Sequence, residues 1–395
     1  MITNQLEFLG RSEQLFGADL RANEREIARI TAQSRFLVLG GGGSIGQAVV
    51  KALFERNPHK LHVVDLSENS LVELVRDLRS SLGYTYGEFK TFAVDIGSAE
   101  FDLLFNKEGP YDFVLNLSAL KHVRSERDPY SLMRMVRVNV MNTLSTLNLA
   151  ESINARYFAV STDKATDPVN LMGATKLLME KAMFSRGAQI NVSSARFANV
   201  AFSDGSLLSS FGSRLKKRQP LVAPTDVHRY FITSEEAGLL CLLSALIGGR
   251  SEILFPKPGV ALEPTGFDEL AVKFLAAHGF EPRFCSSEEE ARELSRSNTS
   301  INEWPCYFAP SNTTGEKEIE EFFSETDELE LNRFEDIGVI KARVQSVEQV
   351  EPFVRGIEEM LVNGTWTKAQ LVNLMKIALP NLSYQDLGFY LDQKM

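Results

Sequence analysis

Four residues with hydroxyl or ionisable side chains follow one another near the middle of the chain. Ser161, Thr162, Asp163 and Lys164 come directly after the apolar run 157–160, which predicts a short buried strand. Open α/β sheets bind their ligands at the carboxyl ends of their strands. A hydroxyl, a carboxylate and an amine at such an end would make a chemical site. The alternative is a solvated loop, because Ser, Thr and Asp are ordinary loop residues.

A helix after this segment would bring a second lysine to the site. Pro168 ends regular structure and Asn170 is a favourable N-cap, which predicts a helix from about Leu171. Met172 and Lys176 are four residues apart and would share one face of that helix. Alternatively, Lys176 is an exposed helical lysine and Met172 only fills the core.

A glycine turn lies between the first predicted strand and its helix. The strand 35–39 runs directly into G-G-G-G-S-I-G at 40–46. Gly40, Gly43 and Gly46 fit the pattern G-x-x-G-x-x-G, in which the backbone approaches a pyrophosphate and a helix amino terminus offers free N–H groups. The alternative is a glycine turn that binds nothing.

The ends of the next strands favour a dinucleotide at this turn. Strand 61–64 ends in Asp65, where an acid binds the adenosine ribose hydroxyls and disfavours a 2′-phosphate, so we expect NAD rather than NADP. Strands 89–94 and 111–117 end in residues suited to contact adenine or to let the cofactor lie close. The predicted NAD contacts are Gly40, Gly43, Ser44, Ile45, Gly46, Asp65, Asp95, Ile96, Ser118 and Ala119.

Strands and helices alternate as far as a strand at 190–195. This order predicts an α/β protein with a Rossmann-like, doubly wound parallel sheet, a smaller C-terminal substrate-binding region and a helical tail. We expect four units: an N-terminal helical arm (1–34), an NAD-binding domain with the catalytic site (35–200), a mainly substrate-binding region (201–345) and the tail (346–395). The tail residues expected to face inward are Leu361, Trp366, Leu371, Leu374 and Met375.

Composition limits the class of protein. The 395 residues are 44% hydrophobic and 24% charged, and no apolar run reaches the ~20 residues of a membrane span. The first 24 residues lack a signal peptide, so we expect a cytoplasmic protein. The net charge of −10 argues against nucleic-acid binding. The three cysteines and five histidines show no metal-ligand spacing, so we expect reduced thiols and no bound metal.

Six segments together carry a resemblance to a known family. They are G-G-G-G-S-I-G (40–46), A-L-K-H-V (119–123), S-T-D-K-A-T-D-P-V-N-L-M-G-A-T-K (161–176), R-F-A-N-V (196–200), R-Y-F-I-T (229–233) and T-G-E-K-E-I-E-E (314–321). The chain resembles the extended short-chain dehydrogenase/reductase superfamily. More narrowly, residues 35–343 resemble the CapD-like nucleotide-sugar 4,6-dehydratases of bacterial surface-polysaccharide biosynthesis.

The resemblance implies removal of water from a nucleotide-linked N-acetylhexosamine, with UDP-N-acetylglucosamine the favoured substrate. NAD⁺ would take hydride from C4, water would leave across C5 and C6, and hydride would return to C6, so that the cofactor is recycled. The product would be UDP-2-acetamido-2,6-dideoxy-4-keto-glucose. The alternatives are a C5-inverting dehydratase or nucleotide-sugar epimerase on the same fold, or a silent NAD-binding scaffold. A homo-oligomer is expected as the general prior.

The resemblance also implies roles for the central residues. Asp163 would be the acid at the C6 hydroxyl and Lys164 the base at C5, while Thr162 would bond the C4 oxygen and Lys176 the nicotinamide ribose. A free lysine is protonated at neutral pH, so the role of Lys164 implies burial or nearby positive charge. The alternative is that Asp163 and Lys164 simply form a surface ion pair.

Two departures from the family pattern concern the chemistry. Met172 stands where most short-chain members have the tyrosine of Y-x-x-x-K, a substitution shared by a branch associated with retention of configuration at C5. Methionine cannot take a proton, so another group must deprotonate the C4 hydroxyl, and the sequence does not identify it. Residues 313–317 read T-T-G-E-K where the family usually has R-P-G-E-K, which removes one expected arginine contact. Glu316 and Lys317 are predicted to be structural.

Five more residues are predicted to bind the nucleotide sugar: Lys121, His122, Arg196, Asn199 and Arg229. The two arginines suit a diphosphate because guanidinium makes forked, charge-assisted hydrogen bonds. Each prediction has a structural alternative. The arginines could be salt-bridge partners, Lys121 and His122 could brace their loop, and Asn199 could cap a loop.

Overall fold

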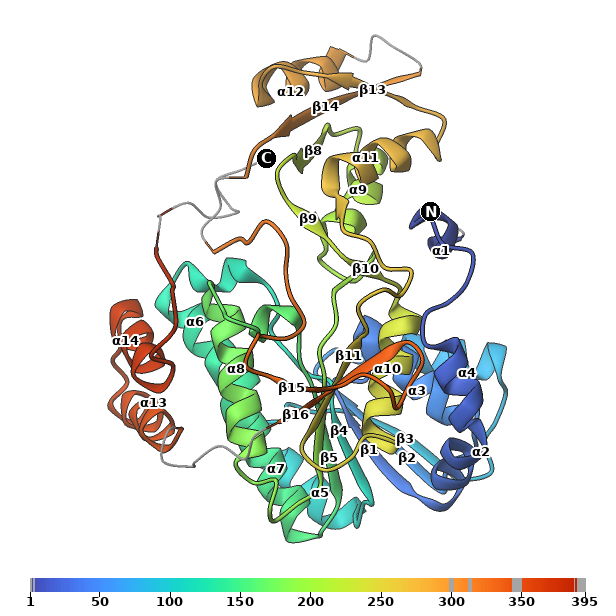
Figure 1. Cartoon of the computed structure of the whole chain (residues 1–395), viewed down its shortest axis with the longest axis vertical. Coiled ribbons are helices and arrows are strands. Elements are labelled where there is room, and N and C mark those ends of the chain that lie inside the picture. Colours follow the sequence, from blue (N-terminus) through green and yellow to red (C-terminus); the bar gives the residue numbers. More distant parts are fainter. Residues whose placement is uncertain are drawn as a thin grey trace.

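A nine-stranded sheet forms the centre of the computed structural model, which describes residues 2, 4–297, 302–311, 315–342, 350–386 and 388 (Figure 1). The strand order is β15-β16-β11-β6-β5-β4-β1-β2-β3. Neighbours from β3 to β11 are parallel, whereas β16 and β15 are antiparallel. The strands are β1 (Arg35–Leu39), β2 (Lys60–Asp65), β3 (Glu88–Ala93), β4 (Phe113–Asn116), β5 (Arg156–Val160), β6 (Val192–Ala195), β11 (Glu252–Pro256), β15 (Glu328–Glu330) and β16 (Ile337–Lys341).

Helices cover both faces of this sheet (Figure 1). In β1, Phe36 and Val38 belong to the apolar cluster on one face, and Leu37 and Leu39 to the cluster on the other, because side chains alternate along a strand. A strand buried on both faces therefore reads as a continuous apolar run. The helices are α2 (Gly17–Gln33), α3 (Ser44–Phe54), α4 (Glu68–Ser81), α5 (Ala99–Glu108), α6 (Pro129–Val136), α7 (Asn142–Ser152), α8 (Leu171–Phe184) and α10 (Ser234–Leu246).

The predicted doubly wound α/β sheet is confirmed, and it takes strands from both sides of residue 200. Strands β11, β15 and β16 and helix α10 all come from the region 201–345, and they extend the sheet and pack against α3. The sheet needs them because β6 would otherwise be an exposed edge with an apolar face. The central sheet therefore includes segments on both sides of residue 200, and the four-unit division stays a prediction.

The rest of the region 201–345 forms a smaller lobe, which stands above the sheet in Figure 1. Its core is an apolar cluster between a three-stranded sheet and two helices. The elements of the lobe and of its connection to the body are β7 (Asn199–Val200), α9 (Leu207–Lys216), β8 (Leu221–Pro224), β9 (His228–Arg229), β10 (Phe231–Ile232), β12 (Thr265–Gly266), α11 (Phe267–Ala276), β13 (Glu281–Phe284), α12 (Glu288–Ser297) and β14 (Glu303–Ala309).

The N-terminal arm packs on the chain's own core. It consists of α1 (Gln5–Phe8) and α2, in which Ile27 is fully buried. The buried carboxylate of Asp19 accepts hydrogen bonds from the backbone N–H groups of Glu335 and Asp336, 2.6 and 2.9 Å away. The arm is thereby tied to the turn before β16.

The C-terminal tail also packs on the same chain. Helices α13 (Glu351–Asn363) and α14 (Lys368–Ala378) lie against α6 and α8 (Figure 1). Of the residues predicted to face inward, Leu371 and Met375 are buried and Leu361, Trp366 and Leu374 are partly buried in this cluster, as expected. Residues 346–349, 387 and 389–395 of the predicted tail lie outside the described residues.

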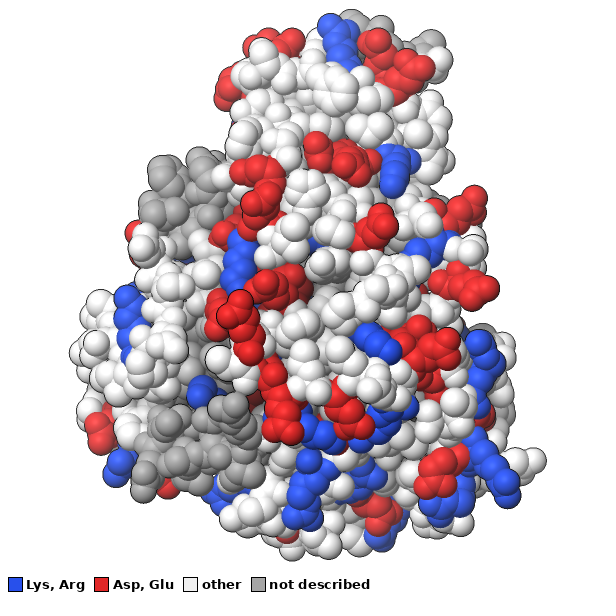
Figure 2. Space-filling view, viewed as in Figure 1, with Lys and Arg blue, Asp and Glu red and all other residues white. Residues whose placement is uncertain are grey.

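Charges of both signs are mixed over the face of the molecule drawn in Figure 2. Within the parts of the chain that the structure describes, no helix combines the length and the apolar character that crossing a bilayer requires.

Candidate active site

The start of α8 is built as the sequence predicts. Asn170 is its N-cap, and its Oδ1 accepts a hydrogen bond from the backbone N–H of Gly173 at 2.7 Å. The Nδ2 of Asn170 donates to the carbonyl oxygen of Gly315 at 2.9 Å. A Cβ at position 173 would overlap the carbonyl oxygen of Lys164, so glycine is needed where α8 meets the segment after β5.

Thr162, Asp163 and Lys164 follow β5 in a short 3-10 turn. Thr162 Oγ1 donates to Asp163 Oδ1 at 2.7 Å, and the backbone N–H of Lys164 donates to the same oxygen at 2.8 Å. The Nζ of Lys164 lies 3.3 Å from this oxygen. The two side chains do form an ion pair, but at 2% and 17% exposed they are not on the surface. The turn therefore orients the carboxyl group and the amine together.

The amine of Lys164 lies among oxygen atoms rather than near cations. Besides Asp163, it donates to Asn199 Oδ1 at 3.2 Å and lies 3.8 Å from Glu320 Oε1. Of the two conditions expected for Lys164, burial or nearby positive charge, the structure provides burial, with 17% of the side chain exposed. Glu320 was not predicted as a site residue, because the segment 314–321 holds four glutamates and nothing local separates them.

Lys176 lies in the middle of α8, and its surroundings differ from those of Lys164. It is buried, and its Nζ donates to the Sδ of Met179 at 3.2 Å. Burial lowers the pKa of Lys176 to about 8, a shift that Glu180 partly opposes. The alternative of an exposed lysine is thus excluded. A thioether is a weak acceptor, so this amine can still donate to a ligand hydroxyl.

Met172 is also buried at the start of α8, with 3% of its surface exposed. Its backbone N–H donates to Glu126 Oε1 at 2.8 Å. Burial raises the pKa of Glu126 to about 7, against the hydrogen bonds from the backbone of Met172 and Leu171. Glu126 was not predicted, since its sequence context is an ordinary polar turn. Through the hydrogen bond from Met172, Glu126 holds the first turn of α8 in place.

The glycine turn leaves a helix amino terminus open. Gly40 has a φ of 75°, and a Cβ there would lie 2.6 Å from the backbone nitrogen of Ser118. Gly43 is the N-cap of α3 and supplies no side-chain hydrogen bond, so the first N–H groups of α3 keep their capacity for an anion. Gly46 lies in the first turn of α3 against the carbonyl of Gly40.

Asp65 stands at the end of β2 beside this turn. Its Oδ2 accepts from the backbone N–H of Gly42 at 2.9 Å and its Oδ1 from that of Ser67 at 2.8 Å. The carboxylate thus orders the turn, and each oxygen retains a lone pair for a ligand hydroxyl.

The other predicted cofactor contacts lie around the same turn. Ser44 Oγ accepts from the backbone N–H of Asp204 at 3.2 Å, and Ile45 packs on the apolar cluster beneath. Asp95 follows β3 and is exposed, while Ser118 follows β4 and donates to Asn116 Oδ1 at 2.7 Å. Ile96 is nearly buried and Ala119 is half-buried.

Arg196 does not offer its guanidinium to a diphosphate. Its Nε and Nη2 donate to the two oxygens of Glu180 at 2.9 and 2.6 Å, and its Nη1 donates to Thr166 Oγ1 at 3.2 Å. The salt-bridge alternative therefore holds. Arg196 lines a cavity of about 530 Å³ between α8, β16 and α14, to which neither Asp163 nor Lys164 contributes.

Arg229 is likewise occupied by the protein itself. Its side chain is 4% exposed, and Nη1 donates to the carbonyl oxygens of His228, Lys317 and Glu318 at 2.8, 2.9 and 3.1 Å. Through Nη1, Arg229 therefore holds the segment 315–321, and its predicted contact with the nucleotide sugar stays a prediction. The neighbouring Thr313 and Thr314, which stand where the family has Arg-Pro, lie outside the described residues.

Lys121 and His122 contact the loop that follows β7. Lys121 Nζ donates to Ser203 Oγ at 3.1 Å, and the His122 ring lies against Gly205, where a Cβ would be 2.8 Å from the ring. Asn139 holds their loop, because it bonds both the N–H and the C=O of Leu120, at 2.9 and 3.0 Å. These contacts agree with a bracing role.

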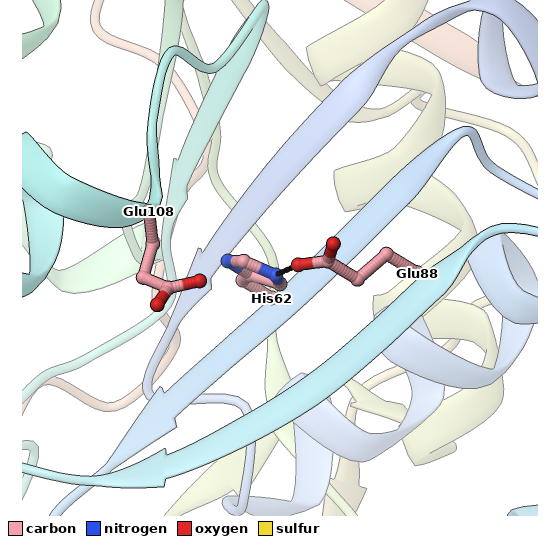
Figure 3. Close-up of side chains that lie close together, drawn as sticks. All are labelled: His62, Glu88 and Glu108. Atoms are coloured by element: carbon pink, nitrogen blue, oxygen red, sulfur yellow. Dashed lines mark hydrogen bonds and ion pairs between the residues drawn. The ribbon is translucent and has the colours of Figure 1, made fainter.

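A histidine and two carboxylates come together at the opposite ends of the strands, which sequence spacing did not predict (Figure 3). His62 Nε2 lies 2.6 Å from Glu88 Oε1, and Nδ1 lies 3.0 Å from the hydroxyl of Tyr111. The Nζ of Lys90 bridges Glu88 and Glu108 at 3.2 and 2.8 Å. The carboxylates are thus already paired with a cation, and the group is an ion-pair network.

The sheet order and the site at its carboxyl edge define a Rossmann-fold protein of the extended short-chain dehydrogenase/reductase type. Residues 36–342 match the polysaccharide biosynthesis protein family, and the chain belongs to that family. The protein is thus a relative of the nucleotide-sugar dehydratases and epimerases.

Three relatives show how far the similarity extends. The chain is 32% identical to an uncharacterized membrane protein of Methanocaldococcus jannaschii, over 65% of this chain and 77% of that one. It is 30% identical to the capsular polysaccharide biosynthesis protein CapD of Staphylococcus aureus, over 68% of this chain but 45% of CapD. It is 29% identical to an inverting UDP-N-acetylglucosamine 4,6-dehydratase of Campylobacter jejuni, over 56% and 66% of the two chains.

Solved structures share the fold. Pen from Bacillus thuringiensis superposes with a TM-score of 0.62 at 21% identity, over 80% of this chain and 90% of Pen. The Bordetella bronchiseptica enzyme WbmF, solved with NADH, gives a TM-score of 0.53 at 17% identity over 88% and 96% of the chains.

Proposed function

We propose that this protein is an NAD-dependent 4,6-dehydratase of a nucleotide-linked N-acetylhexosamine, with UDP-N-acetylglucosamine as the favoured substrate. The observation that carries the proposal is the buried turn in which Thr162, Asp163 and Lys164 form one hydrogen-bonded group at the carboxyl end of β5. This group combines a carboxyl group and an amine, as loss of a C5 proton and a C6 hydroxyl requires. The inverting UDP-N-acetylglucosamine 4,6-dehydratase of Campylobacter jejuni named above supports it as a relative.

The residues around the glycine turn fit NAD. The open amino terminus of α3 suits the pyrophosphate, Asp65 suits the ribose hydroxyls of the adenosine, and Lys176 suits the second ribose. When bound, NAD would supply hydride acceptance at C4 and hydride return at C6. The Bordetella bronchiseptica relative was solved with NADH, which supports the assignment.

Each residue of the turn has one part in the proposal. Asp163, held by Thr162 and by the backbone of Lys164, gives a proton to the C6 hydroxyl as it leaves. The amine of Lys164 removes the C5 proton and later returns it. Asn199 directs that amine, since its Oδ1 accepts a hydrogen bond from Nζ. Burial of the group excludes water that would compete for these protons.

We also propose that configuration at C5 is retained. Met172 provides no hydroxyl at the position of the usual tyrosine, and a single base that removes and returns the C5 proton acts from one face of the sugar. The competing candidate is a C5-inverting dehydratase or an epimerase, which is favoured by the similarity to the inverting dehydratase of Campylobacter jejuni and to a UDP-glucose 4-epimerase of Rickettsia bellii.

Proton NMR of the purified protein with UDP-N-acetylglucosamine in D₂O tests the proposal. A 6-deoxy-4-keto product of gluco configuration with deuterium at C5 is expected without added cofactor if NAD is retained through purification, and with added NAD otherwise. An inverted C5 centre would favour the inverting dehydratase, and a C4 epimer would favour the epimerase. An unchanged substrate with NAD added, and again with the GDP sugar, would refute both the dehydratase and the epimerase.

A further inference from the structure

Glu320 lies beside the amine of Lys164, and one of its two carboxylate oxygens forms no hydrogen bond with the described residues. Its side chain is 2% exposed, and Oε1 lies 3.8 Å from Lys164 Nζ and 3.8 Å from Arg229 Nη2. In the described ranges of the chain this oxygen has no hydrogen-bond partner. Buried polar atoms are nearly always paired, so an unpaired carboxylate oxygen facing a proposed base calls for a functional reason.

The charges that face Glu320 come from three segments. Lys164 and Asp163 belong to the turn after β5, Arg229 to β9, and Lys317 to the segment of Glu320 itself. Burial raises the pKa of Glu320, and Asp163 acts in the same direction, whereas the three cations oppose the shift. Glu320 therefore takes up a proton more readily than an exposed glutamate.

The surroundings of Lys164 create the need for such an acceptor. A base at C5 must be a neutral amine, but Glu320 lies within 4 Å of Nζ, and a carboxylate stabilises an ammonium. Lys164 must therefore give up a proton before its amine can act as the base. Lys164 can become a neutral amine without a change in the net charge of the site only if a neighbouring side chain takes the proton.

We propose that Glu320 accepts the proton that Lys164 must lose before it acts as the base, an inference that rests on the proposed dehydratase function. An N–H bond of Lys164 breaks and an O–H bond forms at Glu320 Oε1, after a side-chain shift of roughly 1 Å to hydrogen-bond distance. The amine then takes the C5 proton of the 4-keto sugar. The electron pair of that C–H bond forms the C5–C6 double bond, and the C6 hydroxyl leaves as water with the proton of Asp163.

The site is then restored, with Asp163 recovering its proton from the C4 hydroxyl, which releases one when it becomes the ketone, or from solvent. The Lys164 ammonium gives its proton back to C5, and the proton on Glu320 then returns to the amine. Glu320 does not touch the sugar in this scheme, so it is a positioning residue that acts through Lys164. The segment 315–321 is fixed by Arg229 and Asn170, which keeps Glu320 in place.

The substitution Glu320→Gln tests this role through the dependence of kcat on pH. Glutamine keeps the size of the side chain but cannot accept the proton, so Lys164 must release it to solvent. We expect kcat to fall at least about tenfold at neutral pH and to rise with pH toward the alkaline side. Glu316→Gln is the matched control, because Glu316 lies 4.0 Å from the same guanidinium on the same segment. Its pH profile should equal that of the wild type.

Glu320→Asp separates proton acceptance from packing. Aspartate keeps the carboxyl group, and we expect it to restore much of the wild-type pH profile even if kcat is lower. A Glu320→Gln variant with the wild-type profile, or one with only a raised KM, would overturn the proposal. Melting temperatures of all three variants establish that they are folded.

Infrared difference spectra provide a readout that needs no turnover. The carbonyl stretch of protonated Glu320 should appear in the wild type as pH falls, and should be missing in Glu320→Gln, in which only the band of Glu126, whose pKa burial raises to about 7, remains. In Lys164→Met the band should persist to higher pH, because one opposing cation is gone. A wild type without dehydratase activity that still shows these bands would refute the proposed function alone. Absence of the band, or a band unchanged in Lys164→Met, would refute the proton exchange.

Discussion

The two lysines of the central motif lie in opposite surroundings. Lys164, at the end of β5, has two carboxylates and an amide oxygen within 4 Å of its amine. Lys176, on α8, is fully buried and donates to a methionine sulfur. Two lysines only twelve positions apart in the sequence therefore have different partners, oxygen atoms for Lys164 and a sulfur atom for Lys176. In the proposed mechanism, the first exchanges protons with its neighbours and the second donates a hydrogen bond to a ribose hydroxyl.

Glu180, the charged residue closest to Lys176 along α8, only partly offsets the effect of burial on the pKa of Lys176. Glu180 follows it by one helical turn, yet both carboxylate oxygens of Glu180 are bonded by Arg196. The Ser161 hydroxyl also donates to Glu180, at 2.5 Å. A third buried charge, Arg196, thus forms the ion pair with Glu180 that Lys176 does not form.

The largest effect is expected where the first lysine is removed. Lys164→Met should reduce kcat by at least about 10³-fold, because no other group can take the C5 proton. NAD binding should change little, whereas stability should fall because the buried Asp163 and Glu320 lose a neighbouring cation. The measurement is the rate of product formation by NMR, together with the melting temperature. Lys107→Met, at the exposed end of α5, is the control and should keep full activity. Residual turnover within tenfold of the wild type would show that Lys164 is not the base.

Glu180→Gln should give the next largest effect, on stability. It would leave the buried guanidinium of Arg196 without its carboxylate, and breaking a buried ion pair costs about 3–5 kcal/mol. Urea denaturation measures the change. Glu151→Gln breaks a pair with Arg186 that is about one third exposed, at 3.5 Å, and should cost at most about 1 kcal/mol. Equal losses in the free energy of unfolding of the two variants would contradict the expectation that the buried ion pair stabilises the fold more than the exposed one.

Lys176→Met should change how stability depends on pH. The pKa of Lys176 is about 8 in the folded protein and 10.5 without the fold, so the unfolded chain binds the extra proton between these values. The stability of the cofactor-free wild type should therefore rise by about 3 kcal/mol from pH 8 to pH 10.5 relative to the variant. Below about pH 8 the difference should be constant. Denaturation midpoints at several pH values test this, and parallel curves for the two proteins would show that Lys176 is not desolvated.

The smallest effect is expected at the glycine turn. Asp65→Asn keeps one oxygen for the backbone of Gly42 or Ser67 but removes the charge that favours the ribose hydroxyls. We expect the Kd for NAD to rise about tenfold, which is about 1.4 kcal/mol, and discrimination against NADP to weaken. Calorimetric titration with both cofactors measures the two effects. An unchanged preference would place the cofactor specificity elsewhere.

Local patterns were sufficient for much of this protein. The order of strand, glycine turn and helix predicted the parallel sheet, because apolar runs and glycines act over a few residues. The start of α8 at Asn170 was predicted for the same reason, since an N-cap bonds a backbone group three residues away. Thr162, Asp163, Lys164 and Lys176 were likewise singled out from sequence.

Tertiary structure alone decided the environment of those residues. Glu320 reaches Lys164 across 156 positions of the chain, and Arg196 turns to Glu180 rather than to the site. Strand β11 completes the sheet from beyond the expected domain boundary. The physical reason is shared: the pairing of buried charges and strand edges depends on distances in space, and a local pattern carries no information about which distant group arrives there.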